Sequence, residues 1–402
     1  MKRKKHVLMI GGGVQQVEAV RQLKEEGWYV GVTDRNPNCP CKKFADYLIT
    51  ADGRDPESII QFLLFNKGKS GLPKAVFTLT ELTTTAAIVS KALGLPTPSV
   101  LGVAISQSKA LSKLYWQNAG ISSPSGVIVS KNTDMSKLLN KIKYPCVVKP
   151  DISFGGRGVT LVENFKELYK ALELAIKYSR SDKCIVEEYI TGSLHDANGF
   201  FSLDGKFFPL SVSDRIWSNK ISVEGGAVCP SNLSTDQQHE FLCLFEKACK
   251  ALGIEYGPVK IDAMFDGKKF FVLEVAARLH GPRNSLFLVP NSYGKYLLPA
   301  VCEAMVKKQR LQWDFSNYKY SSAYEQIIVD KEGKILSIEG IEKVRKMKKI
   351  FNIQLFKNKG DKLTIPSNSS EVVGYVFAVG NNILECQQEI KEAKATLRFH
   401  ID

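Results

Sequence analysis

The stretch from Tyr144 to Val162, YPCVVKPDISFGGRGVTLV, decides the fold class. It reads as two apolar strands around a glycine-rich loop, with Lys149 at the end of the first strand. Glycine has no Cβ, so the backbone N–H groups of Gly155, Gly156 and Gly158 can approach phosphate oxygens closely. Because β-branched residues follow the loop, a second strand is expected there, and the loop is predicted to cap a hairpin as a lid over a nucleotide. The alternative is an ordinary glycine-rich turn beside a solvent-exposed lysine.

Composition narrows the class of protein. A chain of 402 residues is too long for one core, so about two to four domains are expected, and 44% hydrophobic residues predict a globular chain throughout. The net charge of +14 suits a phosphate-rich ligand. Nucleic acid is not expected, because the basic residues are dispersed among 41 acidic ones, without an arginine-rich tract or zinc-finger spacing. A solvated basic surface is the preferred interpretation.

Segments that would direct the chain to a membrane are not found in the sequence. The apolar run after the basic start is too short for a signal peptide, and no stretch approaches 18 consecutive apolar residues. The nine cysteines lie mostly inside apolar runs, and the close pair Cys39 and Cys41 has no second pair or histidine to complete a zinc motif. We therefore predict reduced thiols and a cytoplasmic protein.

The N-terminal hundred residues read as alternating strands and helices. An apolar strand at 6–10 precedes Gly11-Gly12-Gly13, a helix at 14–26 and a strand at 28–33, and the pattern continues with a helix at 56–67, a strand at 75–79 and a helix at 81–93. Gln16 replaces the third glycine of a dinucleotide fingerprint. A nicotinamide cofactor is therefore less expected here than a tight turn whose amides hold a small anion such as a carboxylate.

The rest of the chain is predicted to be mixed α and β. We expect helices at 164–178 and 236–252, a strand in KCIVEEYITG from Lys183, and a hairpin over 200–212. The last hundred residues alternate short strands, at 324–329, 334–338, 351–356 and 375–379, with Lys/Glu/Gly turns, and they end in a helix at about 383–397. This succession of short strands and a final helix predicts a separate small α+β unit.

Two carboxylates, Asp262 and Glu274, lie on the two arms of a hairpin that turns near Asp266-Gly267-Lys268. If the loop is odd-numbered and centred on Lys268, the two side chains face each other with Cβ atoms about 4.5–5.5 Å apart. Like charges so close require a cation between them, and carboxylate oxygens suit the Mg²⁺ that bridges nucleotide phosphates. A register slip that turns one carboxylate to solvent is the alternative.

Three basic residues follow Glu274. Arg278 would stay near the metal and stabilise a developing oxyanion or a transferring phosphoryl group. His280 and Arg283 come next on a predicted loop, where His280 is expected to be structural.

At this point the chain resembles the ATP-grasp superfamily. The resemblance rests on four motifs in the family's order: Ser108-Lys109 opening a helix that ends at Gly120-Ile121, Val148-Lys149-Pro150 before the glycine loop, Glu187-Glu188-Tyr189-Ile190, and Asp262 with Glu274-Val275-Ala276-Ala277-Arg278. It implies an α/β (α+β) fold in three parts. These are a βαβ domain over 1–105, an ATP-grasp domain over 106–305, split into a lid-bearing lobe (106–183) and a metal-binding lobe (184–305), and a small α+β domain over 306–402.

The resemblance also implies roles for individual residues. Lys109 and Lys149 would contact the ATP phosphates, and the loop residues Gly155, Gly156, Arg157 and Gly158 would close over them. The interdomain strand would hold adenine and ribose through Glu187, Glu188 and Ile190, and His195 lies near a position that reaches the ribose in biotin-carboxylase-like members. Asp262 and Glu274 would bind Mg²⁺, for which Mn²⁺ could substitute.

One departure concerns the metal. Many members carry Asn two residues after the second metal carboxylate, whereas this chain has Ala276, so the number of metal ions stays open. The pattern E-x-A-A-R and the C-terminal segment are similar to the L-amino-acid ligase branch. Relatives place a substrate-facing glutamate where this chain has Glu224, which would then pair with a substrate amino group; an ordinary surface-loop residue is the alternative.

The resemblance implies an ATP-dependent carboxylate–amine ligase that passes through an acyl phosphate, with Arg278 as catalytic residue and Glu224, Arg278 and Arg283 as substrate contacts. Its partners would be a small-molecule carboxylate and a small-molecule amine, and neither nucleic acid nor a membrane is expected. Dimers are common in the superfamily, so the resemblance also implies a homodimer as one form of assembly. Two alternatives remain open: another ATP-grasp reaction, by carboxylation or carbamoyl-phosphate-type chemistry, and a nucleotide-binding regulatory protein without turnover.

Overall fold

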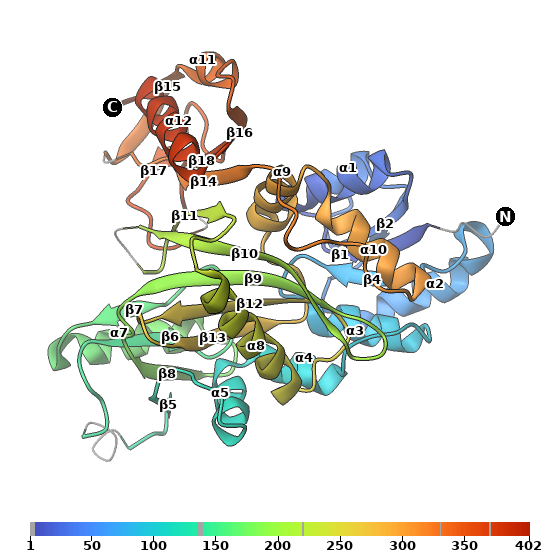
Figure 1. Ribbon diagram of the computed structural model, residues 1–402, viewed down its shortest axis with the longest axis horizontal. Helices are drawn as coiled ribbons and strands as arrows, with labels where there is room; N and C mark the ends of the chain where they lie inside the picture. The colour runs from blue at the N-terminus through green and yellow to red at the C-terminus, as the bar shows by residue number, and fades with distance from the viewer. Residues whose placement is uncertain (1–4, 135–139, 219–220, 330, 370) are drawn as a thin grey trace.

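The computed structural model describes residues 5–134, 140–218, 221–329, 331–369 and 371–402 (Figure 1). It has mixed α/β architecture, as predicted, and is built on four sheets. The expected strands and helices are present, most of them within a few residues of their predicted bounds; the hairpin expected over 200–212 is longer and extends from Ser193 to Trp217. The sequence analysis did not identify the short strand β3 (Tyr47–Thr50) or the helix α4 (Val100–Gln107).

The N-terminal unit is a parallel four-stranded sheet in the order β3-β2-β1-β4. Strands β1 and β4 are fully buried because helices cover both faces, which explains their apolar sequences, whereas the edge strand β3 is partly exposed. Besides β3, the strands are β1 (His6–Ile10), β2 (Tyr29–Asp34) and β4 (Ala75–Thr78). The helices are α1 (Val17–Glu25) after a 3-10 turn at Val14–Gln16, a 3-10 turn at Pro40–Lys43, α2 (Pro56–Ser70), α3 (Thr83–Ala92) and α4.

The lid-bearing unit is an antiparallel sheet in the order β5-β8-β6-β7. The loop between β6 and β7 is the glycine-rich segment, so the predicted hairpin is confirmed. The amphipathic helix α7 buries Leu168, Ala171, Leu172 and Ala175 against this sheet, and Asn164 caps its first turn. The elements are α5 (Lys109–Asn118), β5 (Gly126–Ser130), β6 (Cys146–Pro150), β7 (Thr160–Val162), α7 (Phe165–Tyr178) and β8 (Lys183–Glu188).

An eight-stranded antiparallel sheet, in the order β13-β12-β9-β10-β11-β14-β18-β16, forms the centre of the molecule. Helix α8 packs Phe241 and Phe245 onto it, as its 3–4 spacing predicts. This part contains β9 (Ser193–Phe201), β10 (Phe207–Trp217), β11 (Glu224–Cys229), α8 (Thr235–Ala251), β12 (Gly257–Phe265), β13 (Phe270–Ala276), a π-helix (Arg283–Leu288), α9 (Val289–Tyr293) and α10 (Leu297–Lys307).

The C-terminal strands differ from the expected separate unit. β14 (Ser321–Gln326), β18 (Gly374–Gly380) and β16 (Ile350–Leu355) extend the central sheet, because β14 pairs with β11. A small second sheet and two helices cover this extension, as Figure 1 shows at its upper edge. They are β15 (Gly333–Glu339), α11 (Ile341–Arg345), β17 (Lys362–Leu363), α12 (Ile383–Thr396) and β19 (Arg398–Ile401). The domain boundaries near 105 and 305 stay predictions.

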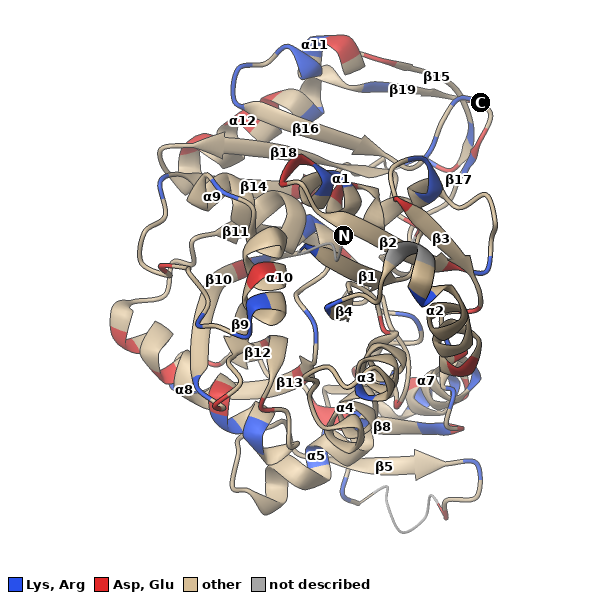
Figure 2. Cartoon of the chain, turned by 90° about the vertical axis from the view of Figure 1, so that its right-hand side faces the viewer, with Lys and Arg blue, Asp and Glu red and all other residues tan. Residues whose placement is uncertain are grey.

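One hydrophobic cluster joins the N-terminal sheet to the central sheet. It contains Val7 of β1 and Leu23 of α1 together with Leu288, Val301 of α10 and Tyr324 of β14. Burial of this contact holds the carboxyl ends of the N-terminal strands against the central sheet. The dispersed charge expected from the sequence is seen in Figure 2, where basic and acidic residues intermix over the elements in view. Among the described residues, no helix is long and apolar enough to cross a membrane.

Candidate active site

A cleft of about 360 Å³ lies between the lid-bearing sheet and the central sheet. Most of the residues that the sequence singled out meet on its walls, although they come from segments more than 170 residues apart. They are Lys109, Lys149, Gly155, Gly156, Arg157, Glu224, Asp262, Glu274, Arg278 and Arg283.

The glycine-rich loop covers one side of the cleft. Gly156 has a φ of +75°, and a Cβ there would collide with the Ser222 carbonyl, so both its conformation and its contact require glycine. Gly158 does not line the cleft; it is buried against Pro150 and Tyr178 and holds the base of the loop. The Ser369 amide of the C-terminal region donates a hydrogen bond of 3.2 Å to the Gly155 carbonyl. The lid is therefore held from two sides.

Glu187 has a different environment from the one expected. Its carboxylate pairs with Lys149 and, at 2.9 Å, with Lys113, and its side chain is 6% exposed. Burial raises the pKa of Glu187, but the two ammonium groups outweigh this effect and hold it below its usual value. Glu187 thus sets the position of the phosphate-directed Lys149, and its contact with adenine stays a prediction.

The other residues expected around adenine and ribose do not line the cleft. Glu188 accepts a hydrogen bond of 2.7 Å from the Ser125 amide, and Ile190 is half-buried. His195 is 4% exposed, bonds to Ser193 and Asp214 through its two ring nitrogens, and packs against Phe241, Phe265 and Phe270. These partners make His195 part of the core beside β9, and a ribose contact would require it to leave them.

Asp262 and Glu274 face each other in register, as predicted, but for a different reason. The hairpin loop has an even number of residues, 266–269, and this loop alone would pair Asp262 with Leu273. A β-bulge between Asp262 and Ala263 inserts the extra residue that restores the pairing.

The cation between these carboxylates in the structure is a side chain. Lys260 Nζ lies 2.6 Å from Asp262 Oδ2 and 2.7 Å from Glu274 Oε1, and the lysine side chain is 4% exposed. Burial raises the pKa of Glu274, but Lys260 and Lys109 outweigh it and hold that pKa below its usual value. Lys260 occupies one oxygen of each carboxylate, Oδ2 of Asp262 and Oε1 of Glu274.

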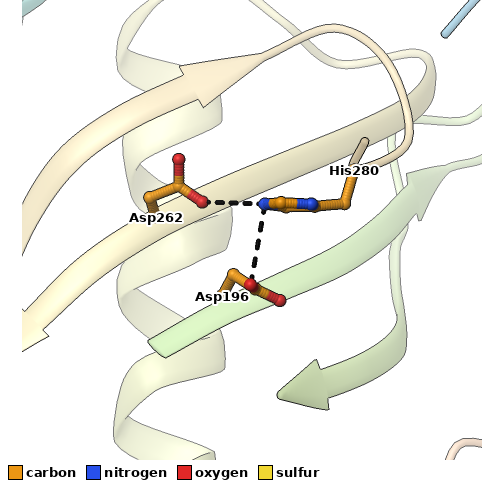
Figure 3. A group of neighbouring side chains, drawn as sticks. All are labelled: Asp196, Asp262 and His280. Atoms are coloured by element: carbon orange, nitrogen blue, oxygen red, sulfur yellow. Dashed lines mark hydrogen bonds and ion pairs between the residues drawn. The ribbon is translucent and has the colours of Figure 1, made fainter. Parts of the chain in front are cut away.

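A further carboxylate and a histidine extend this cluster (Figure 3). Asp196 on β9 is the register neighbour of Asp262, and one oxygen of each lies within 4.8 Å of a nitrogen of His280. His280 Nδ1 accepts from the Gly281 amide, so Nε2 carries the hydrogen that it donates to Asp262 Oδ1 at 3.1 Å. His280, expected to be merely structural, thus orients a predicted metal ligand.

The oxygen donors of Asp262 and Glu274 fit Mg²⁺, which prefers carboxylate oxygen to imidazole nitrogen. The two side chains are 18% and 30% exposed and both line the cleft, so an ion that arrives with nucleotide phosphates can reach them. Ala276 contributes no donor, in keeping with a small protein ligand set.

Two arginines that follow β13, Arg278 and Arg283, also line the cleft. Arg278 is 7% exposed; it donates to Glu81 at 2.5 Å and to the Leu279 carbonyl, while its Nε has no hydrogen-bond acceptor in the described parts of the chain. Arg283 donates to Glu224 at 2.5 Å and lies 4.3 Å from the centre of the Tyr375 ring.

Glu224 is not in a surface loop; it begins β11 and faces the cleft. Arg215 and Arg283 each bond it at 2.5 Å, and the Tyr324 hydroxyl donates to it as well. Burial raises the pKa of Glu224, yet the two guanidinium groups hold it far below its usual value. A substrate ammonium group would therefore have to share a carboxylate that two arginines already bind.

Sequence reasoning missed four charged residues of the cleft region: Glu81, Lys113, Arg215 and Lys260. Lys260 could have been predicted from the sequence, because residues two apart on a strand share a face and Asp262 was already identified. Glu81 and Lys113 carry no local signal, since their partners Arg278 and Glu187 are far away in the sequence. Arg215 pairs with Asp196 and Glu224 on the neighbouring strands β9 and β11, and that strand register was not predicted.

Comparison with protein families supports this description. Residues 142–284 match the ATP-grasp domain, and residues 326–402 match domain 2 of the L-amino acid ligase C-terminal region. The chain therefore carries an ATP-grasp domain followed by a C-terminal domain of the L-amino acid ligase type.

Among curated proteins, D-alanine–D-alanine ligase of Pseudomonas putida is 26% identical over 202 residues, which cover 46% of this chain and 58% of the relative. The match thus spans little more than half the length of that relative. The crystal structure of L-amino acid ligase from Bacillus licheniformis superposes with a TM-score of 0.82 at 20% identity, over 100% of both chains. Phosphoribosylglycinamide synthetase from Anaerococcus prevotii has a TM-score of 0.75 at 19% identity, over 99% of this chain and 100% of the other. At these identities the structures establish the shared fold.

Proposed function

We propose that this chain, with its ATP-grasp domain and its L-amino acid ligase type C-terminal domain, is an ATP-dependent carboxylate–amine ligase. One observation carries the proposal: Lys149, the glycine-rich lid and the register pair Asp262 and Glu274 converge on one cleft. Two lysines and a glycine loop supply donors for a polyphosphate, and the facing carboxylates supply a metal position.

ATP would lie with its phosphates between Lys109, Lys149 and the lid. Lys109 Nζ bonds the Ser153 carbonyl at 3.2 Å, which keeps this ammonium group beside the loop that would close over the phosphates. The Glu187 carboxylate holds Lys149 in place, and the lid excludes water that would hydrolyse an activated intermediate.

Mg²⁺ would be held by Asp262 and Glu274, and when bound it neutralises phosphate charge during transfer; Mn²⁺ is expected to substitute. Lys260 would then shift from one or both carboxylates toward the phosphate oxygens. In this role Lys260 acts as a third phosphate-directed ammonium group on the floor of the cleft.

The reaction proceeds in two displacements. A carboxylate oxygen of the first substrate attacks the γ-phosphorus of ATP, the bond to ADP breaks, and an acyl phosphate forms. The neutral amine of the second substrate attacks the acyl carbon, phosphate leaves with the C–O bonding electrons, and the nitrogen loses a proton to give the amide. Arg278, whose Nε is unpartnered, would donate to the oxyanion of the tetrahedral intermediate.

The test is release of ADP and phosphate from Mg-ATP against a matrix of amino acids, offered singly and in pairs. Release that requires one specific pair, with a new amide product by mass spectrometry, is the expected result. Glu274→Ala should abolish it, whereas Glu246→Ala, which changes an exposed carboxylate on α8, should leave it intact. Release that no pair stimulates, with ATP still bound, would refute the ligase assignment.

A nucleotide-binding protein without turnover is the second candidate. The observation that favours it is Lys260, which already neutralises both predicted metal ligands, together with Ala276 in place of a third one. ATP binding that is independent of Mg²⁺ would support it. Assembly as a homodimer and a cytoplasmic location remain predictions that the same preparation can test by light scattering and cell fractionation.

A further inference from the structure

A second cavity, of about 750 Å³, opens from the cleft toward the N-terminal sheet. Both spaces are lined by Glu81, Phe154, Arg278, His280 and Arg283, so they are continuous. The residues proposed to hold the nucleotide and metal, Lys109, Lys149, Asp262 and Glu274, line the first space and not the second. The second cavity is therefore on the substrate side of the reacting centre.

The topology of the N-terminal sheet favours a ligand at this place. The strand order β3-β2-β1-β4 reverses between β1 and β4, and open parallel sheets bind ligands at the carboxyl ends of strands where the order reverses. Gly11, Gly12 and Gly13 follow β1, and Thr80 and Glu81 follow β4; all five line the cavity.

The charged residues that line this second cavity indicate the charge of its ligand. Five arginines line the cavity against three carboxylates. Arg278 is bound to Glu81 and Arg283 to Glu224, while the third carboxylate, Asp34, accepts from the amides of Gly12 and Asn36.

The remaining arginines are Arg35, Arg54 and Arg180, and none of them has an ion pair among the described residues. Arg54 and Arg180 line the same cavity, where burial, and then the Arg54 charge, lower the pKa of Arg180 and the Glu81 carboxylate opposes them. Arg180 also lies 5.5 Å from the centre of the Phe154 ring in the lid. Arg54 and Arg180 therefore both present guanidinium groups to this cavity, and an anion between them can accept hydrogen bonds from both.

We propose that this arginine-lined cavity binds a distal anionic group, a carboxylate or a phosphate, on one of the two substrates. The inference rests on the proposed ligase function and adds the substrate class: a molecule with its reacting group near Arg278 and a second negative charge near Arg54 and Arg180. The buried, unpartnered Nε of Arg278 lies at the junction of the two spaces, where such a molecule would pass.

Calorimetric titration of the full chain, loaded with Mg-ADP, tests the proposal with two matched pairs of probes. These are L-glutamate against L-glutamine, and O-phospho-L-serine against L-serine. We expect at least one acid to bind about tenfold or more tightly than its neutral partner. The pair that shows the preference identifies carboxylate or phosphate as the distal group.

The double variant Arg54→Ala/Arg180→Ala should lose this preference without weakening the neutral probes, and Arg345→Ala, an exposed arginine on α11, should keep it. Equal binding of acid and neutral probes by the unaltered chain, or a preference that survives in the double variant, would overturn the proposal. Thermal unfolding of each variant checks that it is folded. ADP release is measured in parallel: release without acid preference refutes the subsite alone, and acid preference without release refutes the ligase function alone.

Discussion

Replacement of Lys260 by methionine removes the cation between Asp262 and Glu274 while keeping a side chain of similar length. In the unaltered chain one ammonium group bonds both carboxylates, at 2.6 and 2.7 Å. In Lys260→Met two carboxylates in direct register would face each other without compensation. We expect the variant to be less stable in the absence of divalent metal, and to recover when Mg²⁺ takes the place of the ammonium group.

The magnitude follows from the burial of the three side chains. Loss of one partner from a buried ion pair costs about 3–5 kcal/mol. The lower end applies here, because the carboxylates are 18% and 30% exposed and water relieves part of the repulsion. A loss of about 3 kcal/mol corresponds to a fall of about 6–12 °C in melting temperature for a unit of about 200 residues. Mg²⁺ at a hundredfold excess over its Kd restores about 2.7 kcal/mol.

Differential scanning fluorimetry with EDTA and with Mg²⁺ measures both effects. Mg²⁺ should raise the melting temperature of the variant more than that of the unaltered chain, since in the unaltered chain Mg²⁺ must displace Lys260. The control is Lys250→Met, which removes an exposed lysine paired with Glu246 and should shift stability by no more than about 1 kcal/mol. If the Lys260→Met variant melts at the same temperature as the unaltered chain in EDTA and responds no more strongly to Mg²⁺, then Lys260 does not neutralise Asp262 and Glu274 as described.

Three other predictions concern the lid, the lysine counterion and the core. Gly156→Ala should displace the lid and raise the KM for ATP, measured by steady-state kinetics. The positive φ of this position costs an alanine about 1–2 kcal/mol, and the new Cβ would meet the Ser222 carbonyl. Gly155→Ala should have the smaller effect, because the space around its Cβ is open. Since the pKa of Glu187 is lower in the folded chain, its contribution to stability is complete above the unfolded value of 4.5 and is lost as the pH falls through the folded value. In urea titrations at a series of pH values, Glu187→Gln should therefore lose less stability at acid pH than the unaltered chain does. An equal loss of stability at acid pH would contradict the ion pairs described for Glu187. Phe245→Ala, at a fully buried position on α8, should lower the free energy of unfolding by about 3–5 kcal/mol, and a loss below about 1 kcal/mol would show that the contact is not tightly packed.

Local patterns in the sequence were enough to predict most elements. The apolar run of β1, the 3–4 spacing of α8 and the turn of the β9–β10 hairpin depend on residues close in the chain, and all three are present. Strand β3 was missed because its four residues, YLIT, are too short to show a period.

The facing of Asp262 and Glu274 illustrates the limit of this approach. The prediction assumed an odd loop, while the chain has an even loop and a bulge, and the two departures cancel. The extra residue, Leu273, lies on the edge strand β13, while β12 keeps an unbroken register with β9 on its other side. Sequence spacing alone carries no information on the bulge.

The electrostatic partners of the cleft were the least predictable part. The sequence did not indicate that Glu187, predicted to contact adenine, pairs with Lys113 and Lys149. Nor did it indicate that Glu224, predicted to pair with a substrate amino group, pairs with Arg215 and Arg283. Which charges pair depends on where side chains from different sheets end, and distances of this kind appear only after packing.

The sequence by itself determined the ATP-grasp motifs, their order and the residue types that phosphate and metal chemistry require, because glycine, lysine and carboxylate groups act through local structure. The tertiary structure alone decided that Lys260 lies between the predicted metal ligands, that His195 belongs to the core, and that Arg54 and Arg180 line one cavity. Burial explains the difference, since a charge taken from water must find whichever opposite charge the fold brings within reach.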